Sequence, residues 1–315
     1  MITKKRCYTS SFALLLLLLF AVPYISAQTP VRLPRPSQKA SVMQTIGVTD
    51  VTITYSRPGV KGRVIWGDPL PEQASTKGEA TLDDQNIRPK GAPIVPWGHA
   101  WRTGANEATT FVVTDDVLIN GQKLPAGSYS LHTIPTRDEW TIIFNSVANQ
   151  WGSFFYDPAK DTLRVKVKPE WGNHSKEWLE YWIDPINANS AQVNISWEKV
   201  RIPFIVEVPS VEAVWRAKVD AAMTANPGDE KIPLSVASFY SGEDKWDEAL
   251  AWADKSIKVK ETFQNLSTKA RFLYAAGRKD QAFALADQAI AKGKADKVDT
   301  TSFEKRVATW KASKM

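Results

Sequence analysis

The chain has 315 residues, a single cysteine and a formal net charge of +6. Three of the positive charges lie in the first 27 residues, which leaves +3 for the rest, and residues 28–208 are neutral with 19 basic and 19 acidic side chains. This distribution predicts no concentrated basic face for phosphate groups, so nucleic acid is excluded as an expected partner.

The first 27 residues have the layout of a secretory signal peptide. Lys4, Lys5 and Arg6 precede an apolar run at residues 12–22, and small residues end at Ala27. The run is shorter than the roughly 20 residues that a bilayer span needs. We therefore expect cleavage after Ala27, export to the periplasm or the exterior, and no transmembrane span after the signal is removed.

The only cysteine, Cys7, lies inside this predicted signal peptide. The exported chain then has no disulfide, no thiol nucleophile and no cysteine metal ligand. Removal of 27 residues from 315 leaves 288, which is ample for a hydrophobic core and suggests two domains.

Residues 28–40 (QTPVRLPRPSQKA) are rich in proline and are interpreted as an extended leader. Residues 41–208 alternate between apolar and polar side chains, as at Val51, Ile53 and Tyr55, and Asn120-Gly121 is typical of a hairpin turn. This pattern predicts an antiparallel β-sandwich or a barrel-like domain. Residues 71–94 interrupt the pattern and are expected to form a polar insertion.

From residue 209 to 315 the apolar period changes to that of helices. Ser210 is expected to cap a helix that runs to about Ala225, and Thr301 with Glu304 to form a capping box for a last helix. Between them, two units repeat at an offset of 33 or 34 residues, which is typical of tetratricopeptide-like helical hairpins. We expect this segment to lean on the β domain and to offer a surface for a protein or peptide partner. The paired positions are Tyr240 with Tyr274, Ala249 with Ala282, Ala253 with Ala286, and Ile257 with Ile290.

Six segments of the β domain resemble a bacterial exported family known as domain of unknown function 2911. The resemblance covers about residues 40–208 and implies a mostly β, exported domain with no established activity, so it carries over no catalytic residue. Two features depart from the family pattern, namely the insertion at residues 71–94 and His99. The segments are TYSRPGVKGRVIWG, VPWGHAWRTGANEATTFVV, LPAGSYSLHTIP, EWTIIFN, QWGSFFYD and WEKVRIPFIVEV.

The stretch WGHAWRTGANEATT, residues 97–110, concentrates the candidate ligand-binding residues. Its two tryptophans are interpreted chiefly as core aromatics. Arg102 carries five donors that Asn106 or Glu107 could accept, and the alternatives are a structural ion pair or an arginine that awaits an anionic ligand. The candidate residues are Trp97, His99, Trp101, Arg102, Asn106, Glu107 and, from a neighbouring strand, His132.

A metal site is the strongest catalytic alternative, although the chain has only three histidines. His99, His132 and Glu107 could approach one another across strands and hold a divalent metal that activates water for hydrolysis. No HxH or HExxH spacing is present, and His174 lies in a separate segment. The sequence therefore predicts no cofactor, with His99 and His132 as weak metal candidates.

A glycan-binding module is a further alternative, because nine of the 13 tryptophans lie in the β domain. The segment EWGNHSKEWLEYW, residues 170–182, mixes aromatic, amide and acidic groups. Alternation places Trp178 and Trp182 on one face and Leu179 and Tyr181 on the other, so one set is expected to be exposed or covered by the helical segment.

No convincing catalytic set accompanies the repeat units. The sequence therefore favours a non-catalytic, exported binding or scaffold protein over a metal-assisted hydrolase or a glycan-binding module.

Overall fold

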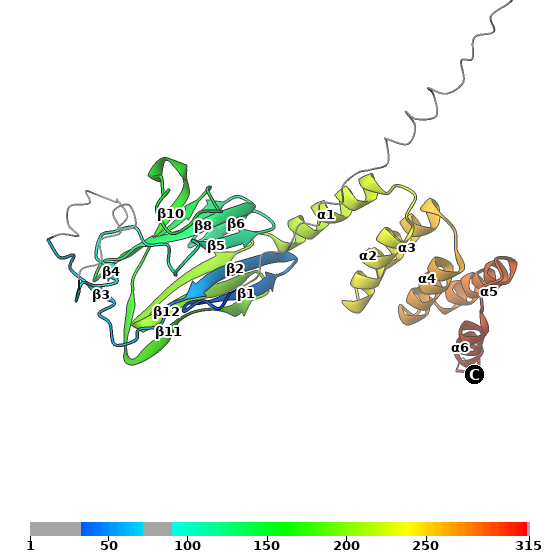
Figure 1. Cartoon of the computed structure of the whole chain (residues 1–315). Coiled ribbons are helices and arrows are strands. Elements are labelled where there is room, and N and C mark those ends of the chain that lie inside the picture. The colour runs from blue at the N-terminus through cyan, green and yellow to red at the C-terminus, as the bar shows by residue number, and fades with distance from the viewer. Residues whose placement is uncertain (1–32, 72–89, 314–315) are drawn as a thin grey trace, which may run out of the picture.

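The computed structural model describes residues 33–71 and 90–313, and its β domain precedes six helices (Figure 1). This arrangement confirms the predicted order of a β domain followed by an all-α segment. The predicted signal peptide and most of the polar insertion lie outside the described residues.

The larger sheet has six antiparallel strands in the order β1-β2-β5-β8-β9-β10. Consecutive residues along these strands point to opposite faces, as alternation requires. The strands are β1 (Gln38–Ile46), β2 (Thr49–Arg57), β5 (Thr109–Val113), β8 (Gly127–Ile134), β9 (Trp140–Asn145) and β10 (Asp161–Val167).

The second sheet has four antiparallel strands in the order β11-β12-β6-β7. Its two long strands, β11 (Glu170–Asn187) and β12 (Ser190–Glu207), form a hairpin that runs along the domain. The short strands are β6 (Val117–Ile119) and β7 (Gln122–Leu124), and a parallel pair is formed by β3 (Trp66–Gly67) and β4 (Val95–Pro96).

One hydrophobic core lies between the two sheets. Val51, Ile53 and Tyr55 of β2 are buried, whereas the threonines between them are half-buried. The core takes side chains from both sheets, including Phe111 and Phe204, whose rings lie 6.3 Å apart. The predicted alternation is therefore confirmed, and the domain is a β-sandwich.

The hairpin turn predicted at Asn120-Gly121 is present. Asn120 and Gly121 have φ values of 46° and 82° and join β6 to β7, as a tight hairpin requires. Strand β1 begins at Gln38 and so contains the last three residues of the segment 28–40, whose first five residues lie outside the described part of the chain.

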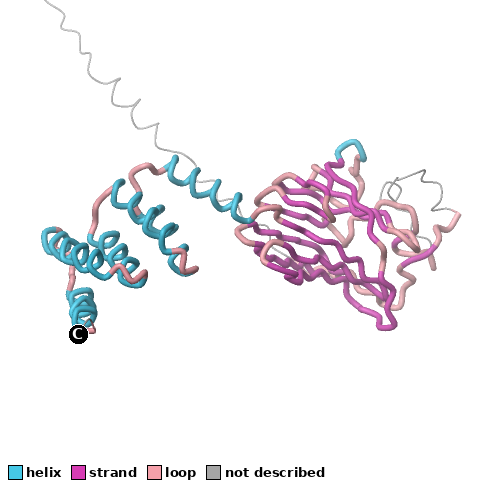
Figure 2. Tube along the Cα trace, turned by 180° about the vertical axis from the view of Figure 1, so that it is seen from behind, coloured by secondary structure: helices cyan, strands magenta, loops and turns pink. Residues whose placement is uncertain are grey.

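The helical segment contains two successive antiparallel hairpins, α2–α3 and α4–α5 (Figure 2). The alanines that repeat in the sequence, Ala249, Ala253, Ala282 and Ala286, are fully buried where the helices touch. The helices are α1 (Val211–Ala225), α2 (Lys231–Gly242), α3 (Trp246–Val259), α4 (Phe263–Ala275), α5 (Lys279–Ala295) and α6 (Thr301–Ala312).

Helix α1 connects the two parts of the molecule. Val211 and Val214 pack against the sandwich core, whereas Trp215 and Val219 pack against a core formed by α2–α5. Helices α2 to α6 stand beyond α1, and within the described residues they cover neither sheet face (Figures 1 and 2). The helical segment was expected to pack on the β domain, and it does so through α1.

The helix caps are partly as predicted. The Ser210 hydroxyl accepts a hydrogen bond from the Ala213 amide, as expected for α1. The last helix begins one residue earlier than predicted: Thr300 is its N-cap, and the Thr300 hydroxyl donates to the Glu304 carboxylate at 2.8 Å. Among the helices in the described part of the chain, none is long and apolar enough to cross a membrane.

Candidate functional site

The stretch WGHAWRTGANEATT leads from β4 into β5 and is fixed at both ends by backbone hydrogen bonds. Trp101 and Thr133 exchange N–H···O bonds of 2.8 and 2.9 Å, which form an isolated bridge to β8. A second bridge joins Glu107 to Trp151. The stretch is therefore a fixed corner of the β domain.

Both tryptophans of the corner belong to an aromatic cluster centred on Trp66. Its ring stacks on Trp97 with 6.1 Å between the centroids and meets Trp101 edge-on at 5.6 Å. Trp140 and Trp197 complete the cluster at 5.1 and 5.7 Å from Trp66. This packing supports the interpretation of Trp97 and Trp101 as core aromatics, although Trp101 also lines a pocket.

Residues 103–106 form a strained turn at the centre of the corner. Thr103 and Asn106 have φ values of 51° and 61°, and such a backbone is unfavourable for a β-branched residue such as Thr103. The Thr103 carbonyl accepts hydrogen bonds from the hydroxyls of Thr109 and Tyr181 at 2.9 and 2.8 Å. Burial raises the pKa of Tyr181 well above its ordinary value, so its hydroxyl stays neutral and holds the turn.

Of the two acceptors predicted for Arg102, Asn106 accepts its hydrogen bond, whereas Glu107 pairs with a different arginine. Arg102 donates to the main-chain carbonyl of Asn106 at 2.6 Å, while the Asn106 amide donates to the Ser37 carbonyl at 3.1 Å. Glu107 pairs with Arg35 at 2.6 Å. Partial burial favours the protonated form of Glu107, but the hydrogen bond and charge of Arg35 outweigh this effect and lower the pKa of the carboxyl.

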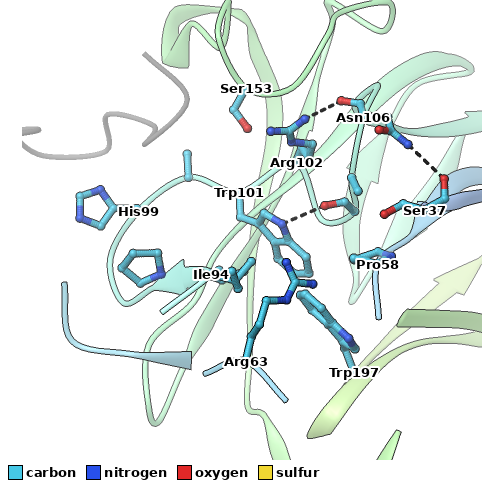
Figure 3. Close-up of a pocket in the computed structure, with 15 residues that line it drawn as sticks. Ser37, Pro58, Arg63, Ile94, His99, Trp101, Arg102, Asn106, Ser153 and Trp197 are labelled. Atoms are coloured by element: carbon cyan, nitrogen blue, oxygen red, sulfur yellow. Dashed lines mark hydrogen bonds between the residues drawn. The ribbon is translucent and has the colours of Figure 1, made fainter. Parts of the chain in front are cut away.

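A pocket of about 380 Å³ opens beside the corner (Figure 3). Its walls combine two tryptophans and several prolines and aliphatic groups with guanidinium, imidazole, amide and hydroxyl groups. The lining residues are Ser37, Pro58, Arg63, Ile94, Val95, Pro96, His99, Ala100, Trp101, Arg102, Gly104, Ala105, Asn106, Ser153 and Trp197.

Arg63 is a charged lining residue that was not among the candidates predicted from the sequence. Its guanidinium donates to the carbonyls of Gly59 and Val60 at 2.5 and 3.2 Å and points into the pocket in Figure 3. The signal that could have found it was available, because Arg63 lies within one of the six segments that carry the family resemblance.

The three metal candidates are not gathered at one place. His99 lines the pocket, whereas Glu107 lines a neighbouring depression with Lys39 and Trp151. His132 is buried in β8 with its ring 4.9 Å from that of Tyr156. Within residues 33–71 and 90–313, no group of three or more His, Cys, Asp or Glu side chains is arranged to hold a metal ion.

The segment 170–182 forms part of β11, and its alternation is as expected. Leu179 and Tyr181 are buried, whereas Trp178 is 40% exposed. The covering element is not the helical segment: Trp178 contacts the loop at Gly59, and the ammonium of Lys61 lies 5.6 Å from its ring. Trp171 and Trp178 are thus the large exposed aromatic groups of this segment.

Comparison with protein families matches residues 37–206 to the family described as protein of unknown function DUF2911. The chain belongs to this family. The match covers more than half of the 315 residues, which confirms the resemblance deduced from the six segments. Comparisons with curated proteins and with solved structures find no match.

Four of the six segments that mark the chain as a DUF2911 protein meet at the corner pocket. Arg63, Arg102, Ser153 and Trp197 each come from a different one of these segments and line the same cavity. The two remaining segments form β8 and β9 of the larger sheet. The pocket is therefore the place where the family-marking residues converge outside the sheet core.

Proposed function

We propose that this DUF2911 protein is a non-catalytic, exported binding protein whose ligand site is the corner pocket. The observation that carries the proposal is the convergence of four family-marking segments on one cavity. A volume of about 380 Å³ is in the range of small-molecule sites in proteins.

The construction of the corner supports a preformed site. The turn at residues 103–106 holds an unfavourable backbone conformation by buried hydrogen bonds, and strained backbone of this kind gathers at ligand-binding sites. The Trp66 cluster supports the pocket wall from behind. A wall that is rigid before binding loses little entropy when the ligand arrives.

A pocket-filling variant tests the proposal. Ala105 is half-buried in the pocket, so Ala105→Phe would occupy its volume, whereas Ala148→Phe makes the same change in the neighbouring depression. We would melt the protein with glucose oligosaccharides, galacturonate, amino acids, dipeptides and inorganic phosphate. A ligand of the folded state raises the melting temperature by mass action.

The proposal expects at least one compound to raise the melting temperature of the wild type and of Ala148→Phe, but not that of Ala105→Phe. A ligand that stabilises all three proteins equally would place the site elsewhere. A flat response to the whole panel would remove the main support for a small-molecule site.

The helical segment keeps its predicted role as a surface for a protein or peptide partner. The observation that favours it is Phe239, which is 49% exposed and whose ring lies 5.5 Å from that of Trp215. Replacement of Phe239 by Ser should weaken such an association and leave the pocket unchanged. An association of equal strength in both proteins would argue against this surface.

The two other functions expected from the sequence have direct tests. The separation of His99, His132 and Glu107 weighs against a metal-assisted hydrolase, and stoichiometric metal in protein purified without chelators would reinstate it. A glycan-binding role at Trp171 and Trp178 predicts a change in tryptophan fluorescence with sugars. Export itself predicts that the protein fractionates with the periplasm or the medium, cleaved after Ala27.

A further inference from the structure

Every polar side chain among the described residues that line the corner pocket can donate a hydrogen bond, and two of these side chains are guanidinium cations. The others are one imidazole, one amide and two hydroxyls, and none of the lining residues in the described part of the chain is Asp or Glu. The nearest acid in sequence, Glu107, lines the neighbouring depression and pairs with Arg35. The lining therefore matches a ligand rich in acceptor atoms.

The backbone acceptors of the corner are already used within the fold. Four main-chain carbonyls of the corner accept hydrogen bonds from the protein itself, so these oxygens do not compete for a ligand donor. The carbonyls and their donors are Trp101 with the Thr133 amide, Thr103 with the Tyr181 hydroxyl, Gly104 with the Trp101 indole, and Asn106 with the Arg102 guanidinium.

Arg63 is oriented before any ligand binds. Its Nε donates to the Val60 carbonyl and one Nη2 hydrogen to the Gly59 carbonyl, so two of its five N–H groups are used. Within the described part of the chain Arg63 makes no ion pair with a carboxylate. Its guanidinium lies beside the side chains of Trp101 and Trp197, which line the same pocket (Figure 3).

A planar guanidinium with fixed orientation matches the two oxygens of a carboxylate or two oxygens of a phosphate or sulfate. We propose that the corner pocket binds the oxyanionic group of its ligand through Arg63. This inference rests on the proposed function and names the chemical class of the ligand.

Small anions test the assignment directly. We would titrate the full protein with acetate, inorganic phosphate and inorganic sulfate, with acetamide as the neutral analogue and chloride at matched ionic strength. Isothermal calorimetry and the melting temperature report binding. The carboxylate and tetrahedral arms distinguish which oxyanion the pocket prefers.

The decisive variants are Arg63→Gln and Lys61→Gln. Each removes one positive charge from the same loop, but Lys61 lies over Trp178, outside the pocket. Loss of a charge-assisted hydrogen-bond pair predicts a Kd about tenfold to a hundredfold higher for Arg63→Gln. Arg63→Lys, which keeps the charge without the fork, should fall between the two and guards against misfolding of the glutamine variant.

The proposal expects saturable binding of at least one oxyanion, unaffected by Lys61→Gln and weakened by Arg63→Gln. It is overturned if acetamide binds as well as acetate, if no oxyanion binds, or if the two variants behave alike. A neutral compound that stabilises the wild type but not Ala105→Phe would show that the pocket binds a ligand and that this ligand is not an oxyanion. No response of the wild type to any anion or neutral compound would reject both.

Discussion

At Gly104 the chain passes so close to its neighbours that a side chain does not fit. A Cβ atom there would lie 2.8 Å from the Thr109 hydroxyl and 3.3 Å from the Ser56 carbonyl oxygen. The Thr109 hydroxyl is itself bonded to the Thr103 carbonyl, so it cannot move without loosening the strained turn. The absence of a side chain at Gly104 therefore permits the close packing of the corner.

Gly104→Ala should therefore lower the free energy of unfolding by about 1–3 kcal/mol, the usual range for overpacking. Urea denaturation measures the change. The matched control is Gly172→Ala in β11, where the nearest atom to a new Cβ is 3.8 Å away. Equal destabilisation of the two variants would contradict the tight packing described at Gly104.

The ion pair between Arg35 and Glu107 predicts a dependence on pH. Because the folded state lowers the pKa of Glu107 below its ordinary value of 4.5, the stabilisation is present above that value. It is lost as the pH falls through the lowered pKa. Both side chains are more than one-third exposed, so Arg35→Gln should cost less than about 1 kcal/mol at pH 7.

The measurement is the difference in free energy of unfolding between Arg35→Gln and the wild type, at pH 7 and near pH 3. The difference should shrink as the pH falls through the lowered pKa of Glu107. A difference that stays constant or grows would show that Arg35 acts through something other than this carboxylate.

The partner of Glu107 illustrates what sequence reasoning misses at the residue scale. Arg102 is five residues away in the chain and was one partner considered for Glu107, whereas Arg35 lies 72 residues away and reaches Glu107 across the fold. Nothing in local spacing signals a contact of this kind. The types of residue in the corner could be predicted, but their pairing depends on tertiary structure.

Among the elements, α1 has the least support from its own packing. None of its side chains is fully buried, and it bridges the sandwich and the helical hairpins. Lys218 of α1 pairs with Asp115 at 2.8 Å. The Val211 side chain lies so close to Gly47 that a Cβ atom at position 47 would collide with it. Burial opposes the ionisation of Asp115, but hydrogen bonds from Lys218, Thr49 and Thr114 outweigh it and lower the pKa of the carboxyl.

Asp115→Asn should loosen the joint between α1 and the sandwich, because it removes a hydrogen-bonded ion pair. Hydrogen exchange of residues 211–219 should become faster, by about tenfold for a loss near 1.4 kcal/mol. The control is Asp116→Asn: the adjacent carboxylate pairs with the exposed Lys123 of β7. Unchanged hydrogen exchange of residues 211–219 in Asp115→Asn would show that this ion pair does not hold α1 to the sandwich.

The elements were predicted to the extent that their signals are local. The alternation of β2 and the repeated alanines of the helical hairpins report burial directly, and both are confirmed. The N-cap of α6 was predicted one residue too late, at Thr301 instead of Thr300. Both threonines are suitable N-cap residues, so the residue types alone do not distinguish them. The sheet order was not predictable, because strand pairing joins segments far apart in sequence.

The whole molecule has separate hydrophobic cores. The core of the sandwich contains no residue of α2–α6 among the described residues, and the two helical clusters contain none of the β domain. Calorimetry of the full chain should therefore show two unfolding transitions rather than one. A single two-state transition would show that α1 couples the parts more strongly than its contacts suggest.

At this scale the binding site was the least predictable feature. Its stretch at residues 97–110 was identified from composition, but its other walls come from the segments around Arg63, Ser153 and Trp197. Only folding brings these segments together. These segments all carry the family resemblance. The prediction that would have located the pocket is that they lie at one site in the folded domain.

The most direct test of the central claim is calorimetric titration of the wild type, Ala105→Phe and Ala148→Phe with the same oxyanion. Our account predicts one binding site per chain in the wild type and in Ala148→Phe, and none in Ala105→Phe. Undiminished binding to Ala105→Phe would show that the corner pocket is not the ligand site.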